Sequence, residues 1–178
     1  MVQQEKGKDF ASLGSPKQAI SGKSPLEICA LYSLMQREFP EQPIVCVGGV
    51  TIRNDMVLLI RRGKEPNRGQ WTLPGGMLAL GERLATGVRR EVQEETGIRV
   101  KPISLLAVFE RIVRKKNAIQ FHYVVADYLC APEGGRLRPA SDVLNARWVR
   151  KAELARYSVL PSAMRVIRQG YDAVSKLR

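Results

Sequence analysis

The segment 76–98 constrains the fold most, because its spacing predicts one amphipathic helix that carries several carboxylates. Apolar residues recur there at every fourth position and predict one buried stripe: Leu84, Val88 and Val92. Three glutamates are three or four positions apart, which brings side chains together on one face of a helix: Glu91, Glu94 and Glu95. The segment is therefore expected to present an acidic face beside a buried one.

Three neighbouring carboxylates repel one another, so we expect a positive charge among them. Clusters of oxygen ligands suit hard divalent cations such as Mg²⁺ and Mn²⁺. Gly97 directly follows the predicted helix, in the position where a left-handed residue commonly ends one. Gly75 and Gly76 precede it and allow a sharp turn that brings backbone carbonyls close to the bound ion.

The whole segment resembles the signature of the Nudix hydrolases, with every fixed position matched: Gly76, Glu82, Arg90, Glu91, Glu94, Glu95, Gly97 and Ile98. From average residue usage, a chance match is on the order of 10⁻⁹ to 10⁻¹⁰ per starting point. The alternative is an ordinary surface helix with a solvated acidic face. The complete pattern, with its glycines and its arginine in register, argues against that alternative.

The resemblance implies an α/β fold, a Nudix-type α/β/α sandwich with a mixed β-sheet. It also implies that the three glutamates hold Mg²⁺ or Mn²⁺ together with the backbone carbonyl of Gly76. Arg90 is expected to orient the acidic residues by pairing with Glu82. The general base differs between branches of the family, and Glu94 is the first candidate here, with Glu133 and Asp142 as alternatives from later loops.

Contacts with the substrate are less constrained by the pattern. Arg62 and Arg114 are candidate phosphate contacts, with Asp142 as a further substrate-binding residue, and solvated surface charge is the alternative for the two arginines. Trp71 is expected to be a core anchor beneath the motif rather than a stacking platform. His122 is the only histidine and lies within a predicted strand, so we expect a structural role and a chemistry based on carboxylates and metal.

Three short segments resemble the ADP-ribose pyrophosphatase branch of the family: 122–124, 127–129 and 146–149. This resemblance implies hydrolysis of ADP-ribose to AMP and ribose 5-phosphate. A house-cleaning pyrophosphatase for oxidised or non-standard nucleoside triphosphates is a rival within the family. A non-catalytic module that binds nucleotides or RNA is a rival of another class. The three metal-binding carboxylates argue against it, because binding alone does not need them.

Composition limits the partners. The 178 residues carry a net charge of +12, but the basic residues are scattered and form no recognisable RNA-binding motif, so specific nucleic-acid binding is disfavoured. No apolar run is long enough to cross a bilayer, and the polar first ten residues lack a signal peptide. Three widely separated cysteines are typical of reduced thiols, which favours a cytoplasmic location. A small nucleotide is the expected partner, and a homodimer is left open.

The chain is expected to have three parts: a flexible segment 1–23, a helical extension 24–40 and a Nudix domain 41–178. The extension is interpreted as a packed lid, with a dimer contact or a mobile flap as alternatives. Within the domain, strands are predicted at 43–52, 56–62, 103–111, 119–130 and 146–149, with loops at 63–69 and 132–135 and a basic turn at 113–117. Helices are predicted at 84–96, 151–157 and 161–176.

Overall fold

The computed structural model describes residues 37–140 and 142–176. The segment 1–23 and nearly all of the predicted helical extension, residues 24–36, lie outside the described residues. By its internal contacts the chain divides into two units, 1–39 and 40–178, and all elements below belong to the second. Within the described part, no helix is both long enough and apolar enough to cross a membrane.

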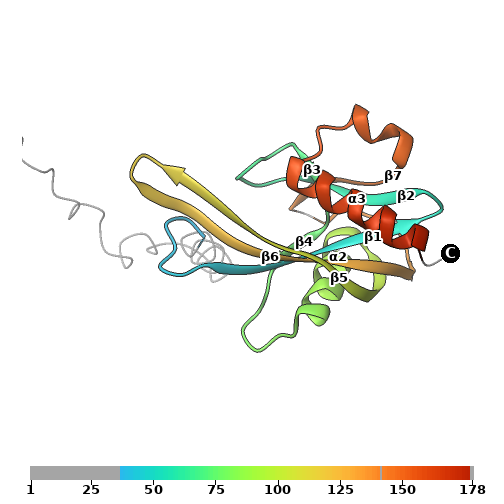
Figure 1. The fold of residues 1–178 in the computed structure, drawn as a ribbon, viewed down its shortest axis with the longest axis horizontal. Helices are drawn as coiled ribbons and strands as arrows, with labels where there is room; N and C mark the ends of the chain where they lie inside the picture. The colour runs from blue at the N-terminus through green and yellow to red at the C-terminus, as the bar shows by residue number, and fades with distance from the viewer. Residues whose placement is uncertain (1–36, 141, 177–178) are drawn as a thin grey trace, which may run out of the picture. The chain divides into compact units, whose positions relative to one another are not determined.

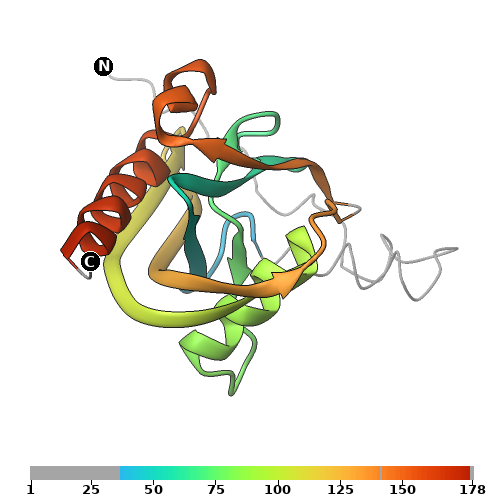
Figure 2. The ribbon, with the colours of Figure 1, turned by 90° about the vertical axis from the view of Figure 1, so that its right-hand side faces the viewer.

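A mixed sheet forms the middle layer of this unit. Its strands are β1 (Ile44–Arg53), β2 (Met56–Arg62), β3 (Trp71–Thr72), β4 (Gly75–Met77), β5 (Ile98–Lys115), β6 (Ala118–Gly135) and β7 (Val143–Arg150). The order is β3-β2-β1-β6-β5, with β4 paired to β1 and β7 paired to β2. The β1–β6 pair is parallel and the other pairs are antiparallel. Figures 1 and 2 show how strongly the strands twist and curl.

Strand β1 pairs with two different strands along one of its edges. This change of partner positions the turn that belongs to the site described below. Residues 46–48 pair with β4, whereas Ile52 and Arg53 pair with β2. Between these two regions, the N–H of Gly49 donates to the carbonyl of Pro74 at 3.0 Å. The glycine-containing turn at residues 75–76 is thereby fixed to the centre of the sheet.

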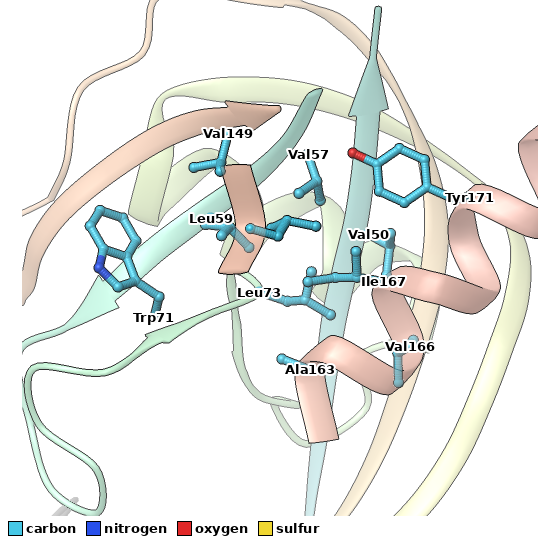
Figure 3. Close-up of a cluster of buried hydrophobic side chains, with 11 residues drawn as sticks. Val50, Val57, Leu59, Trp71, Leu73, Val149, Ala163, Val166, Ile167 and Tyr171 are labelled. Carbon is cyan, nitrogen blue, oxygen red and sulfur yellow. The ribbon is translucent and has the colours of Figure 1, made fainter. Parts of the chain in front are cut away.

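Two helices cover opposite faces of the sheet, which confirms the predicted α/β/α sandwich. Helix α3 (Pro161–Lys176) packs on one face, and Figure 3 shows its buried residues meeting β1 and β2. Helix α2 (Leu84–Thr96) packs on the other, where Val88 and Val92 are fully buried. Successive residues of β2 alternate between these layers, since Leu58 joins the α2 cluster and Leu59 the α3 cluster.

Trp71 confirms its predicted core role. It belongs to the cluster under α3 and meets Tyr157 edge-to-face, with ring centroids 5.2 Å apart. Tyr157 directly follows η2 (Lys151–Arg156), a 3₁₀ helix where an ordinary short helix was predicted to run to residue 157.

The short strands β3 and β4 were not predicted, and the largest errors in predicted boundaries lie in the last three strands. Strands β5 and β6 are longer than the predicted 103–111 and 119–130, and β7 begins at Val143 rather than residue 146. The predicted loop 132–135 is the end of β6, and the basic turn shrinks to residues 116–117. The β5–β6 ladder tolerates Pro132 and two glycines because register shifts absorb the irregular residues.

The close approach of α2 to β1 gives a stability prediction. A Cβ on Gly49 would lie 2.7 Å from Cγ2 of Val92, a side chain with no exposed surface. Gly49→Ala is therefore expected to lower the free energy of unfolding by about 1–3 kcal/mol, because the helix must move outward. Denaturant unfolding followed by circular dichroism measures this change.

Val45→Ala in the same strand is the matched control, since Val45 is 42% exposed. It should change the unfolding free energy by about 0.5 kcal/mol or less. Equal stability of the Gly49 variant and the parent protein would contradict the proposed tight contact between helix and strand.

Candidate active site

Helix α2 has the predicted bounds and the predicted buried stripe. It ends at Gly97, whose φ of 72° is left-handed and whose N–H donates to the carbonyl of Gln93 at 2.8 Å. Val88 and Val92 point into the sheet. Glu91 and Glu95 lie one or three positions from these valines on the helix, so they border the turn formed by Gly75 and Gly76. The predicted helix end and acidic face are both confirmed.

Glu91 and Glu95 lie directly against this turn. The N–H of Gly75 donates to Oε2 of Glu95 at 2.8 Å. A Cβ on Gly76 would lie 2.5–2.6 Å from the carboxylate atoms of Glu91, so only a residue without a side chain leaves that carboxylate in place. A side chain at position 76 would therefore displace the carboxylate of Glu91 from its present place.

Burial makes the ionised form of both carboxylates unfavourable. Burial raises the pKa of Glu95 to about 8, although the hydrogen bond from the Gly75 N–H favours the charged form. Repulsion from Glu91 and Asp142 also raises this pKa. Burial also raises the pKa of Glu91, and the hydrogen bond from Arg90 opposes that rise. Two half-buried, mutually repelling carboxylates form a site that a cation would stabilise.

Arg90 connects the other acidic residues. Its guanidinium donates to both oxygens of Glu82 at 2.9 and 2.8 Å, to Glu91 at 2.6 Å and to Glu94 at 3.2 Å. It also donates to the carbonyl of Met77 at 3.0 Å. These hydrogen bonds hold the pKa of Glu82 down at about 2 and raise the pKa of Arg90. The expected pairing of Arg90 with Glu82 is therefore present, in bidentate form.

Glu94 occupies a different environment. Its side chain is 60% exposed and lies at the solvent edge of the cluster. In residues 37–140 and 142–176, no three acidic, histidine or cysteine side chains converge closely enough to hold a metal by themselves. Glu91 and Glu95 still fit Mg²⁺, because this ion is usually held by one or two carboxylates together with waters and substrate phosphates. The carbonyl of Gly76 stays a predicted ligand.

The other predicted site residues do not all act on the carboxylates of α2. Arg62 donates to the carbonyl of Pro66 at 2.9 Å, and its positive charge acts on Glu95, where it opposes the rise in pKa caused by burial. Asp142 also acts on Glu95, and its carboxylate is 3.6 Å from Nζ of Lys64. Arg114 is exposed near the β5–β6 turn. Glu133, the alternative base expected in a loop, instead lies exposed in β6, so its loop placement was wrong.

Sequence reasoning missed Arg111. This half-buried residue of β5 lies close enough to Arg62 for the two charges to repel, and burial together with this repulsion lowers the pKa of Arg111. Strand alternation offered a weak signal, since Ala107 and Phe109 of the same strand pack against the core under α3. Its nearness to Arg62 comes from the folded chain alone.

The comparisons with known proteins agree with this geometry. A "MutT-like protein" from Streptomyces ambofaciens is 36% identical over 77% of this chain and 84% of its own length. An "ADP-ribose pyrophosphatase" from Methanocaldococcus jannaschii is 33% identical over 60% of this chain and 61% of its own. An "8-oxo-dGDP phosphatase" from Mus musculus is 36% identical over 56% of this chain and only 30% of its own.

The family comparison spans most of the folded unit. Residues 42–169 match the model of the NUDIX domain, a range that includes β1, the glutamates of α2 and most of α3. The carboxylates beside the glycine turn, the Arg90 network and the two-sided packing of the mixed sheet all lie within it. This chain is a member of the Nudix hydrolase family.

Proposed function

We propose that this protein hydrolyses the diphosphate linkage of a nucleoside diphosphate derivative, with ADP-ribose as the leading candidate. The main supporting observation is the half-buried pair Glu91 and Glu95 beside the Gly75–Gly76 turn, with the positive charge of Arg62 acting on Glu95. Similarity to the M. jannaschii protein, which is described as an ADP-ribose pyrophosphatase, supports the choice of substrate. The proposed products are AMP and ribose 5-phosphate.

The chemistry follows from charge. A diphosphate repels an attacking water molecule, and each leaving phosphate carries negative charge. Mg²⁺ or Mn²⁺, held by Glu91, Glu95 and the Gly76 carbonyl, would supply positive charge at the phosphate oxygens and make water more acidic. Arg62 adds a fixed positive charge on the protein side.

The protein groups then have separate tasks. Glu94, at the solvent edge of the cluster, accepts a proton from the attacking water. The water oxygen bonds to one phosphorus, the bridging P–O bond breaks, and the bridging oxygen leaves with the other phosphate. Arg90 is a positioning residue, because its hydrogen bonds to Glu91 and Glu94 hold both carboxylates in place. Asp142 remains the alternative base.

Removing one negative charge from the half-buried pair should abolish most turnover. Glu95→Gln keeps the shape of the side chain and its ability to accept from the Gly75 N–H, but loses the charge that a cation needs. We expect kcat/KM for ADP-ribose with Mg²⁺ to fall by at least about 100-fold. Isothermal titration with Mg²⁺ or Mn²⁺ should show a parallel loss of metal affinity.

Glu41→Gln is the matched control, since it makes the same chemical change at an exposed position just before β1. Its kcat/KM should equal that of the parent protein. If Glu95→Gln is folded by circular dichroism and retains full turnover, the proposed metal site is wrong.

A substrate panel distinguishes the proposed reaction from its rivals. With Mg²⁺, ADP-ribose should give AMP and ribose 5-phosphate, which chromatography of the products identifies. Preferred release of pyrophosphate from 8-oxo-dGTP, or of phosphate from 8-oxo-dGDP, would favour the house-cleaning rival; similarity to the mouse 8-oxo-dGDP phosphatase supports including that substrate. Salt-dependent RNA binding without turnover would favour the binding module.

A further inference from the structure

Strand β5 lies at one end of the sheet, and its outer edge is free over a long stretch. It pairs with β6 on its inner side, and no other strand among the described residues pairs with it. Within 37–140 and 142–176, residues 103–115 make no backbone–backbone hydrogen bond outside the β5–β6 ladder. Figure 1 shows the hairpin of these two strands projecting from the rest of the folded unit. Such an edge presents N–H and C=O groups that can pair with another strand.

The side chains of this stretch alternate between two faces. Phe109 packs against the core under α3, so Arg111 and Val113 lie on the same face. The register with β6 is regular from Ala107 to Val113, and the shift that follows places the extra residue in β6, so the alternation continues to Arg114. The intervening residues share the opposite face, and all are exposed: Val108, Glu110, Ile112 and Arg114.

The face toward α3 is already engaged within one copy of the chain. With the Asn67 amide oriented so that its oxygen faces Arg111, that oxygen accepts from Nη1 of the arginine at 3.0 Å. The exposed face differs, because neither Glu110 nor Arg114 forms an ion pair in the part of the chain that the structure describes. These two charges are therefore available to a strand that pairs with the edge.

A second copy of the same strand complements this exposed face. When an edge strand pairs with its own copy about a twofold axis, the two strands are antiparallel and one residue lies opposite itself. If that residue is Ile112, each Glu110 lies directly opposite Arg114 of the other copy. The contact then contains two equivalent pairs of opposite charge on either side of one apolar pair, and both kinds of cross-strand pair are stabilising.

Neighbouring registers lack this match. Centring the pairing on Glu110 would place two carboxylates opposite each other, and centring it on Arg111 would do the same with two guanidinium groups. Centring it on Val113 would place Arg111 opposite Lys115, which is again a pair of like charges. Charges on an edge strand usually prevent pairing. Here they favour one register, the one centred on Ile112.

We propose that β5 is a homodimer interface, in which residues 109–115 of two copies pair antiparallel about Ile112 and join the two sheets edge to edge. The contact is short, so we expect a reversible dimer with a dissociation constant of about 1–10 µM. Arg114, a candidate phosphate contact from the sequence, is thereby assigned to the interface. None of the carboxylates on α2 takes part in it.

Sedimentation equilibrium of the full-length protein tests this interface. The parent protein should show a monomer–dimer equilibrium between about 1 and 100 µM. Glu110→Lys and Arg114→Glu should each weaken dimerisation at least about 10-fold, because each substitution places two pairs of like charge in contact. An equimolar mixture of the two variants should form dimers again, because every charged pair across the contact is then of opposite sign.

Lys101→Glu is the matched control, since it reverses an exposed charge of the same strand outside residues 109–115. Its dissociation constant should equal that of the parent. Circular dichroism reports whether each variant is folded.

Cysteine cross-linking tests the register separately. Ile112→Cys should form a covalent dimer on mild oxidation with copper phenanthroline, because the two introduced side chains lie opposite each other. Val108→Cys is the control on the same exposed face. Its two copies lie far apart along the paired strands, so cross-linking should stay at the level of the parent.

Three results would overturn the proposal. If the parent is a monomer at about 100 µM, the edge does not bind a second copy at the expected affinity. If the parent dimerises but neither charge reversal weakens the dimer, the interface lies elsewhere on the molecule. If Val108→Cys forms covalent dimers as readily as Ile112→Cys, the register about Ile112 is wrong.

Discussion

The contact on which the site depends is the one between the acidic face of α2 and the Gly75–Gly76 turn. Two carboxylates are half-buried there, and burial raises the pKa of both because it disfavours their charged forms. One backbone N–H and one guanidinium hydrogen-bond to the pair, which leaves its negative charge only partly compensated. The fold therefore holds two carboxylates close together without enough positive charge beside them. A divalent cation would supply that charge.

Arg90 explains how so many acids coexist on a short helix. A single guanidinium with five N–H donors contacts three carboxylates and one backbone carbonyl. Its bidentate bond goes to Glu82, before the helix begins, so the loop and the helix are fixed together. A lysine has no planar fork and would not replace these contacts.

Local spacing predicted α2 well, because a helix brings together residues that are close in sequence. Intervals of three and four residues were enough to place Val88 on the buried face and the glutamates on the acidic face. Strand pairing is different. Glu133 was expected in a loop because Pro132 and two glycines surround it, yet pairing with β5 carries β6 through them. Arg111 was missed for the same reason, since its neighbours Arg62 and Asn67 lie more than 40 positions earlier in the chain.

The fold also gives individual basic residues a position that the composition alone does not reveal. A net charge of +12 spread over the sequence favoured no particular ligand. In the folded chain Arg62 acts electrostatically on both Arg111 and Glu95, although all three are far apart in the sequence. A diphosphate would suit such an arrangement, because its oxygens could contact a cation held by the carboxylates and accept hydrogen bonds from a guanidinium. The combination of partly compensated carboxylates with a nearby arginine charge therefore favours a substrate that is anionic at its centre.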